Sequence, residues 1–234
     1  MDERLKMEAE KKTNFIEWND RMFKKYSPDG MYNHPNFIIR WIERKRIKAI
    51  KKLANIKDDE KVLELGCGDG YILAFLNAGE IYGIDISQVA IDRAKKRLSG
   101  NTRVKHLAVD DGEKTSFSSK FFDVIICSEV IEHVPKPAKL VEEMARLAKP
   151  TGRIIITFPN ESLINKMKSL VRATGLFRIL MKNIPKRMDH EWHLHSFNLD
   201  LFRKTTRGKL KIKSIKKIPL FFLPLRYAAL TKIE

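Results

Sequence analysis

Short apolar runs alternate with amphipathic stretches through the middle of the chain. Continuous runs of Val, Ile and Leu are typical of buried parallel strands, and apolar residues that recur every three or four positions are typical of helices. The predicted strands are 61–65, 81–85, 104–109, 122–127 and 153–158. The predicted helices between them are 71–77, 87–98, with Ser87 as N-cap, and 138–148. This alternation indicates right-handed βαβ units, and therefore an α/β fold with a mostly parallel, doubly wound sheet.

The two flanks of this middle part follow other patterns. Residues 1–12 predict a charged helix, and a strongly basic helix is predicted over 37–53. Beyond the last buried strand, 161–189 predicts one or two basic amphipathic helices and 198–206 a short helix. Lysines alternate with apolar residues over much of 209–218, which indicates a half-exposed strand, and 226–233 predicts a final strand.

Length and composition limit the classes of protein that this chain can be. A chain of 234 residues is most simply one domain. It has no long uncharged apolar stretch, so we expect no membrane span, and its N-terminus lacks the apolar core of a secretion signal. The two cysteines, Cys67 and Cys127, do not have zinc-site spacing. A reduced pair fits a cytoplasmic protein.

A formal net charge of +17 and an isoelectric point near 9.8 indicate an anionic partner, such as RNA, a membrane surface or an acidic substrate. A well-solvated basic surface is the simpler explanation. The basic segment 161–189 could lie on a membrane interface, which would make the protein peripheral to the membrane, or it could pack as a lid.

The clearest chemical signal is a glycine loop that follows the first predicted strand. Gly66, Gly68 and Gly70 stand at every second position, just after a strand that carries Glu64. Glycines there form a tight turn and let backbone amides approach a ligand. Asp85 ends the next strand, where a carboxylate can accept both hydroxyls of a ribose. Together these residues predict a pocket for an adenosine-bearing ligand.

The spacing of the glycines favours S-adenosylmethionine over a nicotinamide cofactor. It is G-x-G-x-G, whereas nicotinamide and flavin enzymes use G-x-G-x-x-G. A pyrophosphate binds at a helix N-terminus, which a cationic sulfonium does not need. Glu64 would also repel a pyrophosphate.

These motifs, over residues 58–158, resemble the class I S-adenosylmethionine-dependent methyltransferases. The resemblance rests on Glu64-x-Gly66-x-Gly68-x-Gly70, on Asp85 and on Cys127-Ser-Glu-Val-Ile-Glu-His-Val134. It implies a Rossmann-like, seven-stranded sheet whose last two strands, 209–218 and 226–233, form a C-terminal hairpin with one antiparallel member. It also implies that Asp111 binds the adenine amino group. The cofactor-binding residues that we expect are Glu64, Gly66, Cys67, Gly68, Gly70, Asp85, Ile86, Asp111, Gly112 and Cys127.

The resemblance also suggests how the chain is organised. The expected parts are an N-terminal helical cap over 1–56, a cofactor-binding core over 57–160, a basic acceptor-side insertion over 161–197, and a C-terminal helix and hairpin over 198–234.

A second group of residues follows the fourth predicted strand. Glu129, Glu132 and His133 stand at i, i+3 and i+4, so on a helical turn they share one face. Two carboxylates and an imidazole could hold a divalent cation, with a fourth ligand from His190, His193 or His195. His133 could instead act as the base that removes a proton from a hydroxyl acceptor, or it could be structural.

This second group resembles two kinds of metal-assisted enzyme. Ubiquinone-pathway O-methyltransferases carry Glu-x-x-Glu-His after the fourth strand and a later His, and Tyr26-Ser-Pro-Asp-Gly30 is similar to their N-terminal region. Small-RNA 2′-O-methyltransferases carry the same Glu-x-x-Glu-His. Metal-free methyltransferases share the motif too.

We therefore expect an S-adenosylmethionine-dependent methyltransferase that acts on a hydroxyl of a small aromatic or lipid-like molecule. The alternatives are a metal-assisted RNA 2′-O-methyltransferase, favoured by the positive charge, and an inactive methyltransferase fold used as a binding scaffold. N-methylation of a base is disfavoured, because Cys-Ser-Glu-Val stands where Asn-Pro-Pro-Tyr would be expected by resemblance.

Overall fold

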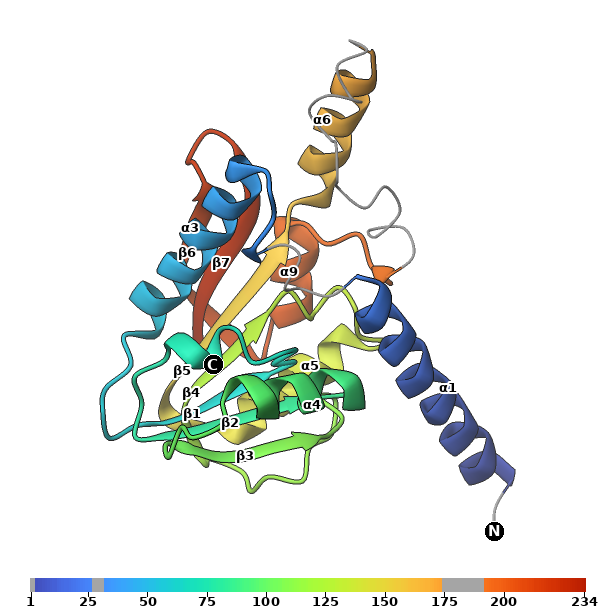
Figure 1. Cartoon of the computed structure of the whole chain (residues 1–234), viewed down its shortest axis with the longest axis vertical. Helices are drawn as coiled ribbons and strands as arrows, with labels where there is room; N and C mark the ends of the chain where they lie inside the picture. The colour runs from blue at the N-terminus through green and yellow to red at the C-terminus, as the bar shows by residue number, and fades with distance from the viewer. Residues whose placement is uncertain (1–2, 27–31, 174–191) are drawn as a thin grey trace.

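A seven-stranded sheet in the order β3-β2-β1-β4-β5-β7-β6 forms the centre of the molecule (Figure 1). The structure is a computed structural model that describes residues 3–26, 32–173 and 192–234. The first five strands pair in parallel, and β7 is antiparallel to both β5 and β6. The strands are β1 Lys61–Leu65, β2 Glu80–Asp85, β3 Val104–Val109, β4 Phe122–Ser128, β5 Ala148–Pro159, β6 Leu210–Pro219 and β7 Pro224–Ile233. This order confirms the predicted doubly wound sheet with a C-terminal antiparallel hairpin.

Helices cover both faces of the sheet, because alternate strand residues point to opposite sides. On β4, Val124 and Ile126 pack beneath α3, the short helix η1 and α4, whereas Ile125 and Cys127 pack beneath α5 and α9. The helices are α1 Glu3–Lys25, α3 Phe37–Ala54, η1 Leu73–Phe75, α4 Gln88–Arg97, α5 Pro137–Leu147, α6 Glu161–Ala173 and α9 Leu199–Thr206. Among the described residues, no helix combines the length and apolarity needed to cross a membrane.

The predicted helix over 71–77 is wrong, because only the 3-10 turn η1 forms there. Ile72, Leu73 and Leu76 have helical spacing, but one turn is enough to bury all three. Leu76 then becomes extended, with ψ at 138°, so that Ala78 is buried and the chain reaches β2.

Other element boundaries differ in smaller ways. The predicted helix over 1–12 is the first part of α1, which continues to Lys25. β5 begins at Ala148, earlier than predicted. Ser87 is the N-cap of α4 as predicted, since its Oγ accepts a hydrogen bond from the Ala90 amide at 3.2 Å. Residues 27–30, and residues 174–189 of the segment predicted to form basic amphipathic helices, lie outside the described residues.

The N-terminal helices lie against distant parts of the chain. α3 packs along β6 and β7, and α1 lies against α4. In Figure 1 the first residues of α3 lie beside the turn that joins β6 to β7. This arrangement places α1 and α3 around the carboxyl ends of the parallel strands, where ligands bind in sheets of this kind.

Candidate active site

A cavity of about 390 Å³ opens at the carboxyl ends of β1, β2 and β4. Its floor is the glycine loop after β1, and its walls come from α1, α3 and the loop after β4. Of the expected cofactor-binding residues, those that line it are Glu64, Gly66, Cys67, Gly68, Asp85, Ile86, Asp111 and Gly112. Gly70 and Cys127 are not among the lining residues.

The backbone of the glycine loop needs glycine. Gly66, Gly68 and Gly70 have φ angles of 73°, 54° and 75°, which L-residues rarely adopt. A Cβ on Gly66 would lie 2.3 Å from Cγ2 of Val130. The amides of Gly66 and Cys67 both donate to the Ile84 carbonyl, at 2.8 and 2.9 Å, so the end of β2 holds the loop in place.

Asp85 is fixed beside this loop by two backbone donors. One carboxylate oxygen accepts a hydrogen bond from the Gly68 amide and the other from the Ser87 amide, each at 2.9 Å. Burial raises the pKa of Asp85, and these two amides act in the opposite direction. The sequence did not indicate a contact from α1, where Asp20 accepts a hydrogen bond from the Ser87 hydroxyl at 2.5 Å.

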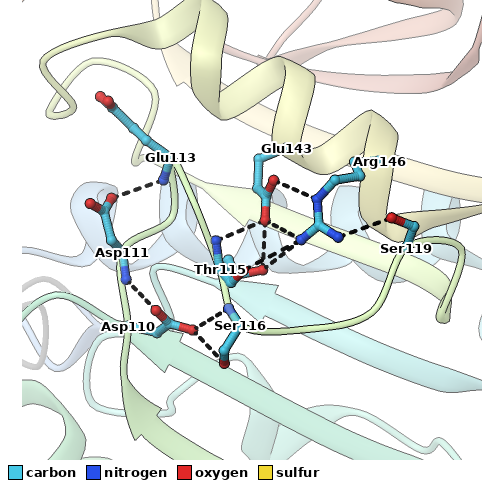
Figure 2. Close-up of polar contacts among 8 residues, drawn as sticks. All are labelled: Asp110, Asp111, Glu113, Thr115, Ser116, Ser119, Glu143 and Arg146. Atoms are coloured by element: carbon cyan, nitrogen blue, oxygen red, sulfur yellow. Dashed lines mark hydrogen bonds and ion pairs between the residues drawn. The ribbon is translucent and has the colours of Figure 1, made fainter.

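The loop after β3 presents Asp111 to the cavity. Figure 2 shows Asp110 turned back into its own loop, where it accepts hydrogen bonds from the Asp111 amide at 2.8 Å and the Ser116 amide at 3.0 Å. Asp111 accepts from the Glu113 amide at 3.0 Å. The buried carboxylate of Glu143 on α5 accepts from the Thr115 amide at 2.8 Å and ties the loop to the helix layer (Figure 2).

Glu64 is buried at the bottom of the cavity. Its Oε2 has no hydrogen-bond partner among the described residues. Burial raises the pKa of Glu64, and the Arg46 guanidinium opposes that shift. Arg46 is itself buried, and it donates to the Ser128 hydroxyl at 2.5 Å and the Tyr32 hydroxyl at 2.9 Å.

Arg46 and Glu43 were missed from the sequence, although a signal was present. Both stand on the apolar face of α3, with Ile39 and Ile50, and both are buried there. A charged residue on an apolar helix face is rarely buried unless it is paired. Arg46 Nε donates to Glu43 Oε2 at 2.9 Å, and Arg226 on β7 pairs with the other Glu43 oxygen.

Glu129, just after β4, brings a second carboxylate to Arg226. Its carboxylate accepts from the Thr157 hydroxyl at 2.8 Å and lies 2.8 Å from Nε of Arg226. It has a φ of 56°, unusual for a residue other than glycine. We call Glu43, Arg46, Glu129 and Arg226 the ion network, in which Glu43 and Arg46 are buried and Glu129 and Arg226 are partly exposed. Burial alone would raise the pKa of Glu43, but Arg226 and Arg46 outweigh burial and lower it to about 2.

Glu132, His133 and His193 form a separate group, in which one ligand atom of each lies within 4.8 Å of the others. Glu132 is buried, and its Oε2 has no hydrogen-bond partner in the described part of the chain. Burial and then the Glu129 carboxylate raise the pKa of Glu132. Glu129, one of the four ligands expected from the sequence, is outside this group.

Each of these two imidazoles is oriented through its Nδ1. His133 Nδ1 lies 3.0 Å from the Trp192 carbonyl oxygen, and His193 Nδ1 lies 2.7 Å from Glu161 Oε1. A carbonyl only accepts, so Nδ1 of His133 donates in this contact, and in the neutral imidazole Nε2 carries the lone pair. Among the three later histidines, His195 instead contacts the Val134 carbonyl at 3.0 Å, and His190 lies outside the described residues.

Both cysteines are buried and free, and burial raises the pKa of each thiol. Cys127 lies in the core beneath α5 and α9. Gly70 packs against α4, where a Cβ would lie 3.2 Å from Cβ of Ala94. These contacts give Gly70 and Cys127 a role in packing.

Comparison with known proteins places the chain in a family. A family model described as a methyltransferase domain matches residues 38–207. A ubiquinone biosynthesis O-methyltransferase of Alkalilimnicola ehrlichii is 28% identical over 173 residues, which cover 73% of this chain and 68% of the relative. An enzyme of the same name from Coxiella burnetii is 30% identical over 139 residues, 58% of this chain and 59% of the relative.

Solved structures agree at the level of the fold. The N-methyltransferase NodS of Bradyrhizobium japonicum, in complex with S-adenosyl-L-homocysteine, has a TM-score of 0.67 at 16% identity and covers 94% of this chain and 98% of its own. A SAM-dependent methyltransferase of Aquifex aeolicus has a TM-score of 0.62 at 15% identity, over 92% of this chain and 97% of its own. The family match covers most of the chain and includes the glycine loop, Asp85 and the residues that follow β4. The chain therefore belongs to the methyltransferase-domain family and is an S-adenosylmethionine-dependent methyltransferase.

Proposed function

We propose that this enzyme transfers the methyl group of S-adenosylmethionine to a hydroxyl of a small aromatic or lipid-like acceptor, and that Glu132, His133 and His193 face that hydroxyl. The observation that carries the proposal is this group of one buried carboxylate and two partly exposed, oriented imidazoles in the wall of a cavity whose surface is mainly apolar. The named relatives are O-methyltransferases of ubiquinone biosynthesis, which is consistent with a hydroxyl on an aromatic ring.

The charges in the cavity suit S-adenosylmethionine, whose sulfonium and ammonium are positive and whose carboxylate is negative. Asp85 would accept the ribose hydroxyls, and Asp111 the adenine amino group. At the amino-acid end, Glu64 would pair with the ammonium, because its buried Oε2 has no other partner among the described residues. The nearby Arg46 guanidinium would attract the carboxylate.

The reaction needs an acceptor hydroxyl that is aligned with the methyl group, and a base that takes up its proton. The acceptor oxygen attacks the methyl carbon in line with the sulfur, the carbon–sulfur bond breaks, and S-adenosylhomocysteine leaves as a neutral thioether. The hydroxyl proton must go to a base. The lone pair on Nε2 of His133 can accept it, because Nδ1 already donates to the Trp192 carbonyl.

The same group also fits a divalent cation. Ligating histidines commonly donate their other nitrogen to a carbonyl or a carboxylate, as His133 and His193 do toward Trp192 and Glu161. Glu132, with its unpartnered buried oxygen, would supply the anionic ligand. A bound cation would lower the pKa of the acceptor hydroxyl. We propose as ligands Glu132, His133 and His193. Glu129 is not included, because its carboxylate pairs with Arg226 in the ion network.

The test combines calorimetry with an acceptor screen. S-adenosylhomocysteine titrated into the protein should bind with micromolar affinity, equivalent to about −8 kcal/mol. Hydroxylated aromatic rings with an apolar tail are then assayed with and without chelator. His193→Gln should abolish turnover while cofactor affinity is retained, and His195→Gln, outside the group, is the matched control. Full turnover in His193→Gln would overturn the assignment, and turnover unchanged by exhaustive chelation would leave His133 as the base without a metal.

Binding measurements on the same purified protein distinguish two alternative functions. An RNA 2′-O-methyltransferase should bind RNA with an affinity that falls steeply with salt. The slope of log K against log salt concentration should be about −0.7 to −0.9 per neutralised phosphate. A binding scaffold should not bind S-adenosylhomocysteine at all.

We also propose a cytoplasmic location, since both thiols are buried and free.

A further inference from the structure

Five large apolar side chains are exposed at one end of the molecule, and we call them the aromatic rim. Three come from the first turns of α3: Phe37 is 70% exposed, Ile38 45% and Trp41 37%. The other two, Phe221 and Phe222, are 78% and 79% exposed in the turn that joins β6 to β7. Exposed apolar side chains that gather in one place mark an interaction site more often than scattered ones do.

The aromatic rim borders the cavity. The start of α3 lies beside the β6–β7 turn (Figure 1). Ile39 and Ile42, on the next face of α3, line the cavity, and so do Leu225 and Arg226 just after the turn. A surface that binds through the rim would therefore also lie close to the cavity wall.

The exposed charged residues of α3, β6, β7 and the turn between the two strands are all positive. The amino group of Lys45 lies 5.6 Å from the centre of the Trp41 ring, and that of Lys217 lies 4.1 Å from the centre of the Phe221 ring. Glu43 is the only acid in α3, and it is buried in the ion network. β6, β7 and the turn between them contain no Asp or Glu. The exposed surface of these elements is therefore apolar at its tip and basic behind it.

We propose that the aromatic rim and the lysines behind it dock the enzyme on an anionic lipid membrane. Phenylalanine and tryptophan side chains would enter the headgroup region, and the lysines would contact anionic headgroups. The proposal rests on the lipid-like acceptor of the proposed function, because such an acceptor could then enter the cavity directly from the membrane.

The geometry favours a membrane over RNA. Single-stranded RNA is held in a basic groove whose aromatic rings each stack on a base. The rim instead includes an uncharged, projecting turn, Pro219-Leu-Phe-Phe-Leu-Pro224, that carries two adjacent phenylalanines. A projecting apolar turn can insert between lipids, whereas it offers no groove for a phosphate backbone.

The test is sedimentation of the full chain with vesicles. Vesicles of phosphatidylcholine alone should bind little protein, and added phosphatidylglycerol should raise binding at least tenfold in a salt-dependent manner. Phe221→Ser with Phe222→Ser should reduce that binding at least tenfold, and Phe37→Ser should weaken it independently. Val109→Ser is the control, because Val109 is an exposed apolar residue on β3, at the opposite edge of the sheet from β6.

Two further measurements separate this proposal from the proposed function. The Phe221→Ser, Phe222→Ser variant should bind S-adenosylhomocysteine with wild-type affinity, which also shows that it is folded. Wild-type vesicle binding by this variant, or no binding of the wild type to anionic vesicles, would overturn the docking surface and leave the methyltransferase assignment intact. Displacement of the vesicles by polyuridylate, lost in the same variant, would replace the membrane with RNA.

Discussion

Replacing Arg226 with methionine tests the ion network directly. The guanidinium lies between two carboxylates, pairing with Glu43 and lying 2.8 Å from Glu129 at its Nε. Methionine keeps much of the volume but leaves both carboxylates short of a cation, with only Arg46 still paired to Glu43. Removing one member of a buried ion pair typically costs about 3–5 kcal/mol, because the partner charge stays buried.

The effect should be large enough to read in a thermal melt. For a chain of this length, about 1 kcal/mol corresponds to a shift of about 2–4 °C in Tm, so we expect Arg226→Met to melt about 6–20 °C below the wild type. Arg203→Met is the matched control. Its partner Asp200 lies 3.6 Å away, but the two side chains are 56% and 93% exposed, so the loss should stay below about 1 kcal/mol. A loss of less than about 1 kcal/mol in Arg226→Met would refute the argument that the network stabilises the fold.

The remaining predictions concern acid, the glycine loop and α1. The pKa of Glu43 is lowered to about 2 from an ordinary 4.5, which contributes about 3 kcal/mol to the free energy of unfolding above pH 4.5. This contribution is lost as the pH falls toward 2. Thermal melts over this pH range should show a smaller acid-induced loss of stability in Arg226→Met than in the wild type. Gly66→Ala should cost a few kcal/mol and abolish S-adenosylhomocysteine binding in calorimetry, since its Cβ would meet Val130 at 2.3 Å. Gly100→Ala has a similar φ of 82° with nothing within 4 Å, so equal damage there would contradict the steric explanation. Asp20→Ala should lose about 1 kcal/mol and make α1 more sensitive to protease, and unchanged proteolysis would show that the bond to Ser87 does not hold the helix.

The sheet and the glycine loop could be predicted because their signals are local. A buried strand appears as a continuous apolar run, and three glycines at alternate positions have a backbone reason to be there. Asp85 follows from the place of β2 beside β1. The helix predicted over 71–77 failed because apolar spacing gives periodicity but not the distance that the chain must still cover to reach β2.

The ion network could not be predicted in the same way, because its pairs are long-range. Glu43 and Arg226 are 183 positions apart, and nothing in either segment identifies the other. Glu129 and Glu132 are three positions apart and look equivalent in sequence, yet one faces Arg226 and the other faces His193. Which of the three later histidines approaches Glu132 depends on the path of a loop, and spacing alone left that open.

The pairing of α3 with β7 has a consequence for biosynthesis. Helix α3, which carries Glu43 and Arg46 in the cavity wall, leaves the ribosome early. Arg226, which pairs α3 with the sheet through Glu43, is translated 183 residues after Glu43. A nascent chain can form the glycine loop and the parallel strands before β7 exists, but Glu43 is then paired with Arg46 alone. The cavity wall formed by α3 therefore gains its ion pair to the sheet only after the last strand is made.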